Sequence, residues 1–275
     1  MTEPIKGLDQ PAQGSGMVPL GPQGMVIAIQ YFHGDEQRCM RLARLLAAIE
    51  PKRRDDVTLA FCRRFDTPMT PLAWETFLYC GRKFGVCQIQ SERRGVGHPC
   101  GANELWAGTM EKFAEGWPAG IPRRSAVFLI EHDGCPLRAD WISMLLAEHA
   151  RSVAAGYSIT GPYMGFLPHI NGTLIMQVPW WIDHPSVHQT PPEEGWDIYH
   201  RETILADAYR TKLILNLHGS RKWKRDQLVP IAGEYAWMTS AKDDSVITWA
   251  EKSLVAKRGK RAVWKPLPRL DVTAT

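Results

Sequence analysis

Short apolar runs alternate with helix-type patterns through residues 25–150, and this alternation constrains the fold more than any other feature. The runs MVIAIQYF, VTLAFC, VCQIQ and AVFLI predict four strands, which begin at Met25, Val57, Val86 and Ala126. Strands that alternate with helices pair in parallel, and the helices cover both faces of the sheet. We therefore expect an α/β fold with a Rossmann-type, mainly parallel sheet. Such sheets bind their ligands beyond the carboxyl ends of the strands.

Helix starts between these strands are indicated by residues that favour the N-terminal cap or the first turn. They are Asp35, Thr70 followed by Pro71, Asn103 and Asp140. The helix after Asn103 is expected over Glu104–Phe113.

The second half of the chain is less regular. SITGPYMGF, HINGTLIMQ and TKLILNLHG predict strands, and Asp197–Ala208 predicts a helix. Residues 179–195 predict a long irregular loop, and connections above about 12 residues often cover active sites. Trp180 and Trp181 in this loop either pack into the core or stack on a sugar or a flipped base.

Composition is that of an ordinary globular protein, with 44% hydrophobic and 23% charged residues. Residues 1–24 predict a disordered leader, and residues 25–275 a single domain with a basic C-terminal region from about 220 to 275. No apolar run approaches the roughly 20 residues of a membrane span, and no signal-peptide pattern is present, so we expect a cytoplasmic protein. The six cysteines are scattered and are interpreted as reduced core thiols.

Two acids follow the fourth predicted strand directly, in the segment AVFLIEHDGCP. In an extended backbone Glu131 and Asp133 would share one face, because side chains alternate along a strand. Carboxylates in this position suit Mg²⁺ or Mn²⁺, which share such ligands with substrate phosphates. The alternative is that the two acids only end the strand and cap the next turn.

Basic residues gather late in the chain, although the net charge is only +4. They surround tryptophans, a composition that suits a nucleic-acid backbone beside exposed bases. The candidate nucleic-acid-binding residues are Arg221, Lys222, Trp223, Lys224, Lys257, Arg258, Lys260 and Arg261. The alternative is a solvated basic face with packed indoles.

Four local patterns together resemble the GT-A glycosyltransferases, over roughly residues 25–220. LIEHDGCPLRADW resembles the metal-binding D-x-D motif of that family, with Glu131 first and Asp133 last. HINGT, which contains Asn171 and Gly172, resembles the glycine loop beside the donor sugar. Asp197 in GWD resembles the acid that faces the acceptor hydroxyl, and His218 in NLHG resembles the histidine that completes the metal coordination.

The resemblance implies a GT-A-like fold, a nucleotide-sugar donor, which we expect to be a UDP-sugar, and a divalent metal. It implies metal ligands Asp133, Glu131 and His218. The nucleotide-sugar contacts that we expect from it are Tyr31, His33, Arg63, Arg64, Asp66, Asn103, Glu131, Asn171 and Gly172. His132 and His169 are interpreted first as hydrogen-bonded structural residues.

Asp197 would act as general base in an inverting reaction, and would position the acceptor or stabilise charge in a retaining one. The alternative is an acid that interacts with a helix dipole. A basic, tryptophan-bearing C-terminal region favours a DNA acceptor, so we hypothesise transfer to 5-hydroxymethylpyrimidine, as in phage-type DNA glycosyltransferases. The alternatives are a polysaccharide or protein acceptor, a sugar nucleotidyltransferase and a non-catalytic nucleic-acid-binding protein. The oligomeric state is left open.

Overall fold

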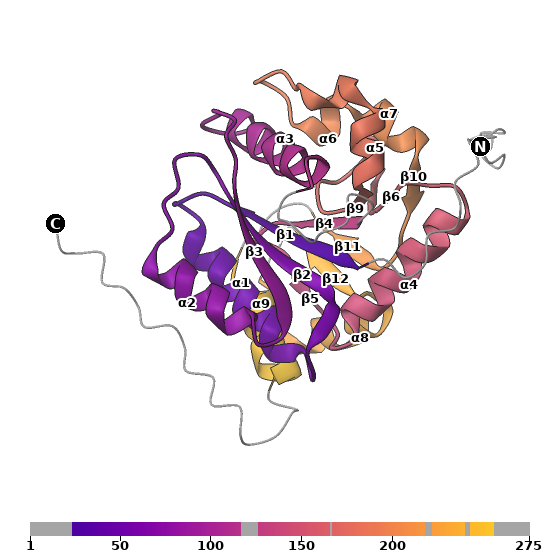
Figure 1. Ribbon diagram of the computed structural model, residues 1–275. Coiled ribbons are helices and arrows are strands. Elements are labelled where there is room, and N and C mark those ends of the chain that lie inside the picture. Colours follow the sequence, from indigo (N-terminus) through magenta and orange to yellow (C-terminus); the bar gives the residue numbers. More distant parts are fainter. Residues whose placement is uncertain (1–23, 117–125, 166, 218–221, 240–242, 256–275) are drawn as a thin grey trace, which may run out of the picture.

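A seven-stranded, mainly parallel sheet forms the centre of the molecule (Figure 1). The computed structural model describes residues 24–116, 126–165, 167–217, 222–239 and 243–255. The expected leader therefore lies outside the described residues. The first half alternates as the pattern predicts, through β1 (Met25–Tyr31), α1 (Glu36–Ile49), β2 (Arg54–Arg63), α2 (Pro71–Cys80), β3 (Phe84–Gln90), α3 (Cys100–Ala114), β4 (Ala126–Ile130), β5 (Cys135–Pro136) and α4 (Trp141–Ala154).

The second half consists of shorter elements. They are β6 (Ile159–Gly161), β7 (Tyr163–Met164), β8 (His169–Ile170), β9 (Ile175–Gln177), α5 (Val178–Asp183), the 3₁₀ turn η1 (Pro185–His188), α6 (Trp196–Tyr199), α7 (Arg201–Ala206), β10 (Ala208–Arg210), β11 (Ile214–Asn216), α8 (Arg225–Glu234), β12 (Trp237–Thr239), α9 (Ser245–Ala250) and the π-helical turn η2 (Glu251–Val255).

The strand order of the large sheet is β10-β6-β9-β4-β1-β2-β3. β1 pairs in parallel with both β2 and β4, β2 pairs in parallel with β3, and β6 pairs in parallel with β10. β9 runs antiparallel to its neighbours β4 and β6. The carboxyl ends of β1, β2, β4, β6 and β10 consequently lie along one edge of the sheet, which we call the carboxyl edge.

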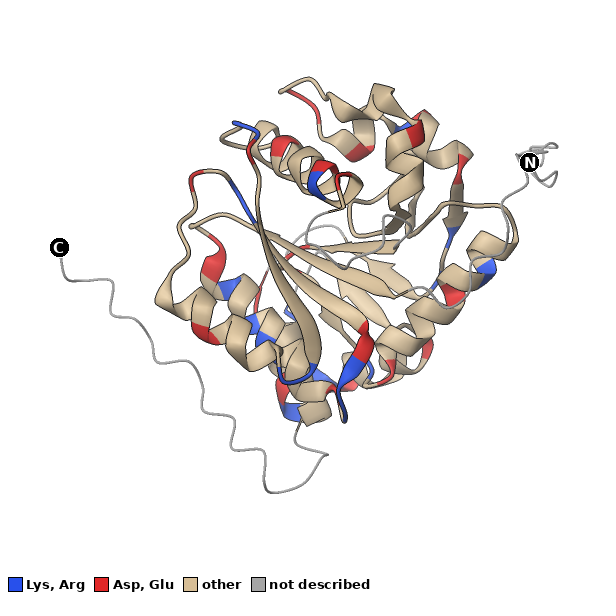
Figure 2. Cartoon of the chain, in the orientation of Figure 1, with Lys and Arg blue, Asp and Glu red and all other residues tan. Residues whose placement is uncertain are grey.

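Helices cover both faces of the sheet, as expected (Figure 1). Apolar residues of α1, α2, α4 and the C-terminal elements form one buried cluster with alternate strand residues such as Ile27 and Phe128. Residues of α3 and α5 form a second cluster with the intervening strand residues, such as Val26 and Val127. Figure 2 shows that charged residues gather at the ends of the strands and on the outer helices. The α/β fold class predicted from the sequence is confirmed.

Helix starts are predicted correctly in three of the four positions. Thr70 caps α2, because its hydroxyl accepts from Ala73 N at 3.1 Å. Asp35 and Asp140 occupy the cap positions of α1 and α4, although their side chains make no capping hydrogen bond. The prediction for Asn103 is wrong, since α3 already begins at Cys100 and Asn103 lies inside its first turns.

Two predictions for the second half need correction. One is the expected irregular loop, which contains α5 and η1. Of the two alternatives for Trp180 and Trp181 in this segment, core packing is the one observed. The helix expected over Asp197–Ala208 is divided at His200 into α6 and α7, and Ala208 belongs to β10. Among the described residues, no helix is both long enough and apolar enough to cross a membrane.

The C-terminal elements close over α1 and the start of α4. β11, β12 and β5 form a second, three-stranded sheet, and Trp237 of β12 packs against Phe128 and Trp141. Arg41 of α1 makes the polar contacts of this junction. Its guanidinium donates to both carboxylate oxygens of Glu251 at 2.8 and 2.9 Å and to the Thr248 hydroxyl at 2.8 Å. It also pairs with Asp244 at 2.9 Å.

We predict that Arg41→Met lowers the free energy of unfolding by about 2 kcal/mol, the scale of a partly buried charged hydrogen bond. The matched control is Arg38→Met, because Arg38 lies one turn earlier, is 53% exposed and reaches Asp244 only at 4.0 Å. An exposed pair of this kind contributes about 0–1 kcal/mol. Urea denaturation of both variants measures the difference, and equal losses would contradict the assigned role of Arg41.

Candidate functional site at the carboxyl edge

Polar residues follow β1, β2 and β4 where these neighbouring strands end at the carboxyl edge. The segment after β1 contributes His33 and Asp35, the segment after β2 contributes Arg64 and Asp66, and the segment after β4 begins with Glu131. β9 runs in the opposite direction, so the residues that precede it reach the same edge. That approach brings Gly172 to the end of β4.

Glu131 and Asp133 are not arranged as the alternation argument expects. β4 ends at Ile130, and the next residues form a turn in which Gly134 N donates to Glu131 O at 3.2 Å. Glu131 is exposed, whereas Asp133 is buried beside a cavity of about 20 Å³. A Cβ atom at Gly134 would lie 2.7 Å from Trp237 Nε1, so the close approach of β12 requires glycine in this turn.

Asp35, Cys39 and His132 form a cluster beneath this turn that the sequence reasoning missed. Their potential ligand atoms all lie within 4.8 Å of one another. Asp35 Oδ1 accepts from Phe32 N at 2.9 Å, and its Oδ2 lies 3.4 Å from His132 Nδ1. Burial, followed by the charges of Asp35 and Glu131, raises the pKa of the Cys39 thiol. The cluster could have been suspected from Asp35 and Cys39, which stand four residues apart at the start of a helix.

Two carboxylates lie close to Gly172. A Cβ atom built there would lie 3.8 Å from Asp197 Oδ2 and 3.9 Å from Glu131 Oε1. The Gly172 amide donates to Asp197 Oδ2 at 3.1 Å, and the preceding Asn171 uses its side-chain oxygen to accept from Thr173 N at 3.0 Å. Acids that are 66 residues apart in the sequence thus lie near the same backbone position.

Asp197 is the most buried carboxylate that faces Gly172. Burial raises the pKa of Asp197, while His169 and the backbone amides of Gly172 and Ile198 oppose that shift. His169 Nε2 lies 4.0 Å from Asp197 Oδ2, and its Nδ1 lies 2.6 Å from Leu167 O. Because a carbonyl oxygen accepts only, Nδ1 carries a proton and donates to Leu167. His169 is therefore hydrogen-bonded and structural, as first interpreted, and it also contributes to the electrostatics of Asp197.

The residues after β1 and β2 differ in their access to a ligand. Tyr31 is 1% exposed and packs in the core, so a contact between its ring and a nucleotide is excluded in this conformation. Arg63 donates to Thr67 O at 2.7 Å, and Arg64 makes a bidentate pair with Asp66 at 2.7 and 2.8 Å.

Phe32 is the accessible aromatic residue at this end of β1, and the sequence reasoning missed it. Its ring is 37% exposed, and the Arg64 guanidinium lies 4.9 Å from the ring centroid. His33, which is exposed, lies 5.4 Å away edge-on. Its position directly after an apolar strand is the signal that could have identified Phe32.

Asn103 anchors the segment that leads to Asp197. It is 2% exposed, and its side-chain amide donates to Pro191 O at 3.3 Å and to Glu194 O at 2.7 Å. Its oxygen accepts from Trp196 N at 3.0 Å, and the Trp196 ring stacks on Trp106 at 4.0 Å. With its amide engaged in this way, Asn103 holds the loop rather than a nucleotide.

Several predicted site residues lie outside the described residues. They are His218, Arg221, Lys257, Arg258, Lys260 and Arg261. Lys222 and Lys224 are described and exposed, and Trp223 is partly buried against the core, with its amide donating to Ser245 Oγ at 2.9 Å.

Comparison with known proteins gives no family assignment. No protein-family model and no curated protein sequence matches the chain. Similar solved structures include the glycosyltransferase GlyE of Streptococcus pneumoniae TIGR4, with 11% identity, a TM-score of 0.44 and coverage of 69% of this chain and 45% of that one. Mouse xyloside xylosyltransferase 1 in its apo form has 9% identity, a TM-score of 0.48 and coverage of 81% and 98%.

S. aureus TarS 1-349 has 12% identity, a TM-score of 0.40 and coverage of 65% of this chain and 56% of that one. The chain thus spans less than half of GlyE and little more than half of that TarS structure. At identities this low, and with TM-scores of at most 0.48, these proteins do not indicate what this chain binds or transfers.

We predict that Asn103→Asp lowers the free energy of unfolding by about 2–3 kcal/mol, because a buried acceptor would face the carbonyls of Pro191 and Glu194. Hydrogen exchange over residues 191–196 should also accelerate, since the loop loses its anchor. Gln37→Glu, the same amide-to-acid change at an exposed position of α1, serves as control and should change stability little. Unchanged exchange of the loop in Asn103→Asp would contradict the anchoring role.

Proposed function

We propose that this chain is a metal-dependent glycosyltransferase that moves a sugar from a nucleotide-sugar donor, most simply a UDP-sugar, to a hydroxyl acceptor. The observation that carries the proposal is the position of Gly172 at the carboxyl edge, where a Cβ atom would lie within 4 Å of carboxylate oxygens of both Glu131 and Asp197. Sugar transfer can use two acidic groups near the reacting carbon. One would serve the departing diphosphate through a metal ion, and the other the incoming hydroxyl.

The donor nucleotide fits the ends of β1 and β2. The exposed ring of Phe32 offers a stacking surface for a base. Arg64 beside it is buried and paired with Asp66, so it would contact a donor phosphate only if that pair opens. His33, Arg63 and Asp66 remain proposed neighbours of the ribose and base. Asn171 and Gly172 would lie beside the sugar, and Tyr31 and Asn103 would support the site from the core without touching the donor.

Glu131 and Asp133, after the end of β4, offer hard oxygen ligands of the kind that Mg²⁺ and Mn²⁺ prefer. Among the described residues the side chains that already gather closely enough to hold an ion are those of Asp35, Cys39 and His132, so Glu131 and Asp133 would have to turn towards a common cation. The neighbouring Cys39 fits such a cation poorly, because its thiol is fully buried and burial raises its pKa. We propose Asp133 and Glu131 as ligands, together with His218. When bound, the cation would neutralise the charge that develops on the departing diphosphate.

Asp197 is the proposed acceptor-side acid. Since burial raises the pKa of Asp197 from that of an ordinary aspartate, it is a stronger base towards a hydroxyl proton. If the reaction inverts the anomeric carbon, Asp197 Oδ2 takes that proton. If it retains configuration, Asp197 positions the acceptor or stabilises positive charge on the sugar.

For the acceptor we propose 5-hydroxymethylpyrimidine in DNA, which a host or phage cytoplasm would supply. A polysaccharide or protein acceptor is the alternative within the same reaction class. A sugar nucleotidyltransferase would instead release pyrophosphate, and a non-catalytic nucleic-acid-binding protein would show no turnover.

We predict that one nucleoside diphosphate stabilises the chain in the presence of Mn²⁺. At about 100 times its dissociation constant it should add about 2.7 kcal/mol, measured as a thermal shift. Asp133→Asn should lose this shift relative to its own melting temperature, because the metal-bridged diphosphate loses a ligand. Asp55→Asn, an exposed acid at the amino end of β2, should keep it. The absence of a shift with every nucleotide, or equal shifts in parent and Asp133→Asn, would refute the donor site.

We also predict that Gly172→Ala lowers the rate of sugar transfer at least tenfold, measured as the nucleoside diphosphate produced per unit time. This corresponds to an increase of about 1.4 kcal/mol in the activation free energy. The added methyl group would fill the point that Glu131 and Asp197 face, while Trp196 at 3.3 Å needs to move only slightly. Gly165→Ala is the matched control, because a Cβ atom there meets nothing within 4 Å. Equal rates for both variants would mean that the reacting groups do not meet at Gly172.

A further inference from the structure

An exposed aromatic residue and a cation are stacked at the other end of the carboxyl edge. Tyr163 begins β7 and is 37% exposed, and the Arg210 guanidinium at the end of β10 lies 4.0 Å from the centroid of its ring. Arg210 is exposed, as is Lys212 two residues later. Within the part of the chain that the structure describes, the partner of this arginine is a ring rather than a carboxylate, so its positive charge remains available to a ligand.

The sheet topology places this pair on the acceptor side of the proposed site. Along the carboxyl edge the strands follow the order β2, β1, β4, β9, β6 and β10. Phe32 and Arg64 follow β1 and β2, Glu131 follows β4, and Gly172 precedes β9. Tyr163 follows β6 closely, and Arg210 is the last residue of β10. A donor over β1 and β2 therefore has its sugar near Gly172 and leaves the edge over β6 and β10 for the acceptor.

Backbone contacts connect the pair to the candidate site. Tyr163 pairs with Ile170 in the β7–β8 hairpin, and Asn171 N donates to Pro162 O at 3.2 Å. Thr211 N donates to Gly161 O at 3.0 Å, which holds the end of β10 against the end of β6. Tyr163 is thus paired with Ile170, the residue directly before Asn171 and Gly172. The Gly172 amide in turn contacts Asp197.

We propose that Tyr163 and Arg210 form a nucleic-acid subsite, in which Tyr163 stacks on a base of the acceptor strand and Arg210 binds a phosphate beside it. The assignment rests on the proposed transfer to DNA and specifies where its acceptor lies. Aromatic rings accept any base by stacking, and an arginine beside the stacked base can bind a backbone phosphate. A neutral sugar would use the ring without the charge, so the pair favours a nucleic acid.

The test measures binding of a fluorescein-labelled single-stranded DNA of about 12 nucleotides by fluorescence anisotropy, with the full chain and without donor. Tyr163→Ala should weaken binding about 5- to 100-fold, the range for loss of one stacked base. Tyr163→Phe keeps the ring and should bind as the parent does. Arg210→Gln should lower the slope of log affinity against log salt concentration by about 0.7, because one phosphate contact is lost.

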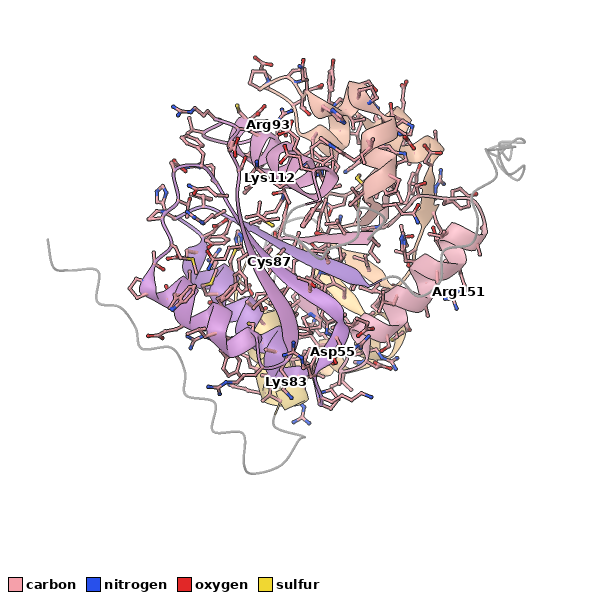
Figure 3. The ribbon with its side chains drawn as sticks, viewed as in Figure 1. Asp55, Lys83, Cys87, Arg93, Lys112 and Arg151 are labelled. Atoms are coloured by element: carbon pink, nitrogen blue, oxygen red, sulfur yellow. The ribbon has the colours of Figure 1, made fainter. Side chains whose placement is uncertain are left out.

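Lys83 is the control for Arg210, because it is a cation at the opposite end of the sheet. Figure 3 shows Lys83 and Asp55 at the end where β2 and β3 begin, away from α3. Lys83→Gln removes one positive charge there and should leave both affinity and salt slope near those of the parent. The same titrations with dextran sulfate, a polyanion without bases, separate charge from stacking, and Tyr163→Ala should leave its affinity unchanged.

No binding of the oligonucleotide by the parent, or parent-like binding by Tyr163→Ala, would overturn the subsite. A loss of dextran sulfate affinity equal to the loss of DNA affinity would overturn the assignment to a nucleic acid. Failure of the proposed transfer has a different signature. In that case no nucleoside diphosphate stabilises the chain, whereas the effects of Tyr163 and Arg210 on DNA binding persist.

Discussion

The parallel pairing of β1 with β2 on one side and β4 on the other is the constraint on which the rest of the molecule depends. Met25 is in register with Val57 and with Ala126, so β1 and β2 end together at Tyr31 and Arg63, and β4 ends two residues earlier at Ile130. β1 is apolar on both faces and is enclosed by the two buried clusters. The charged residues of these strands lie near their ends, as Arg54, Asp55 and Asp56 do at the start of β2, so the middle of the layer is apolar. The proposed donor-side residues, the acids and the Tyr163–Arg210 pair all lie along the carboxyl edge.

The elements that the sequence predicts well are those with strong local signals. Apolar runs with β-branched residues identify β1 to β4, and Thr70 followed by Pro71 identifies the start of α2. Asn103 shows where local signals fail. It favours a cap by type, yet its amide makes three hydrogen bonds to residues about 90 positions later, and no local pattern reports such a contact. The same holds for Trp180 and Trp181, which the local pattern predicts to lie in a loop. Their burial in the second cluster depends on α3, an element distant in the sequence, which no local pattern reports.

For the candidate site, the sequence predicts which residue types occur better than it predicts how they are arranged in space. HINGT and Asp197 were grouped by pattern, and the structure brings Gly172 and Asp197 into contact. Glu131 and Asp133 are expected to share a face, but alternation holds only while the strand continues, and β4 ends at Ile130, three residues before Asp133. Tyr31 and Phe32 differ from the expectation for a related reason. Tyr31 is the last residue of β1 and packs in the core with residues of α1, whereas Phe32 follows the strand and is exposed.

The contacts of Arg41 have a consequence for how the chain is made. Arg41 lies in the first helix, and Glu251 follows 210 residues later. At about 5–20 residues per second, roughly 10–40 s separate the synthesis of the two. During this interval α1 can pack on β1 and β2, but the Arg41 guanidinium still lacks the carboxylate of Glu251. The nascent first half therefore remains an incomplete layer until α9 and η2 have been synthesised.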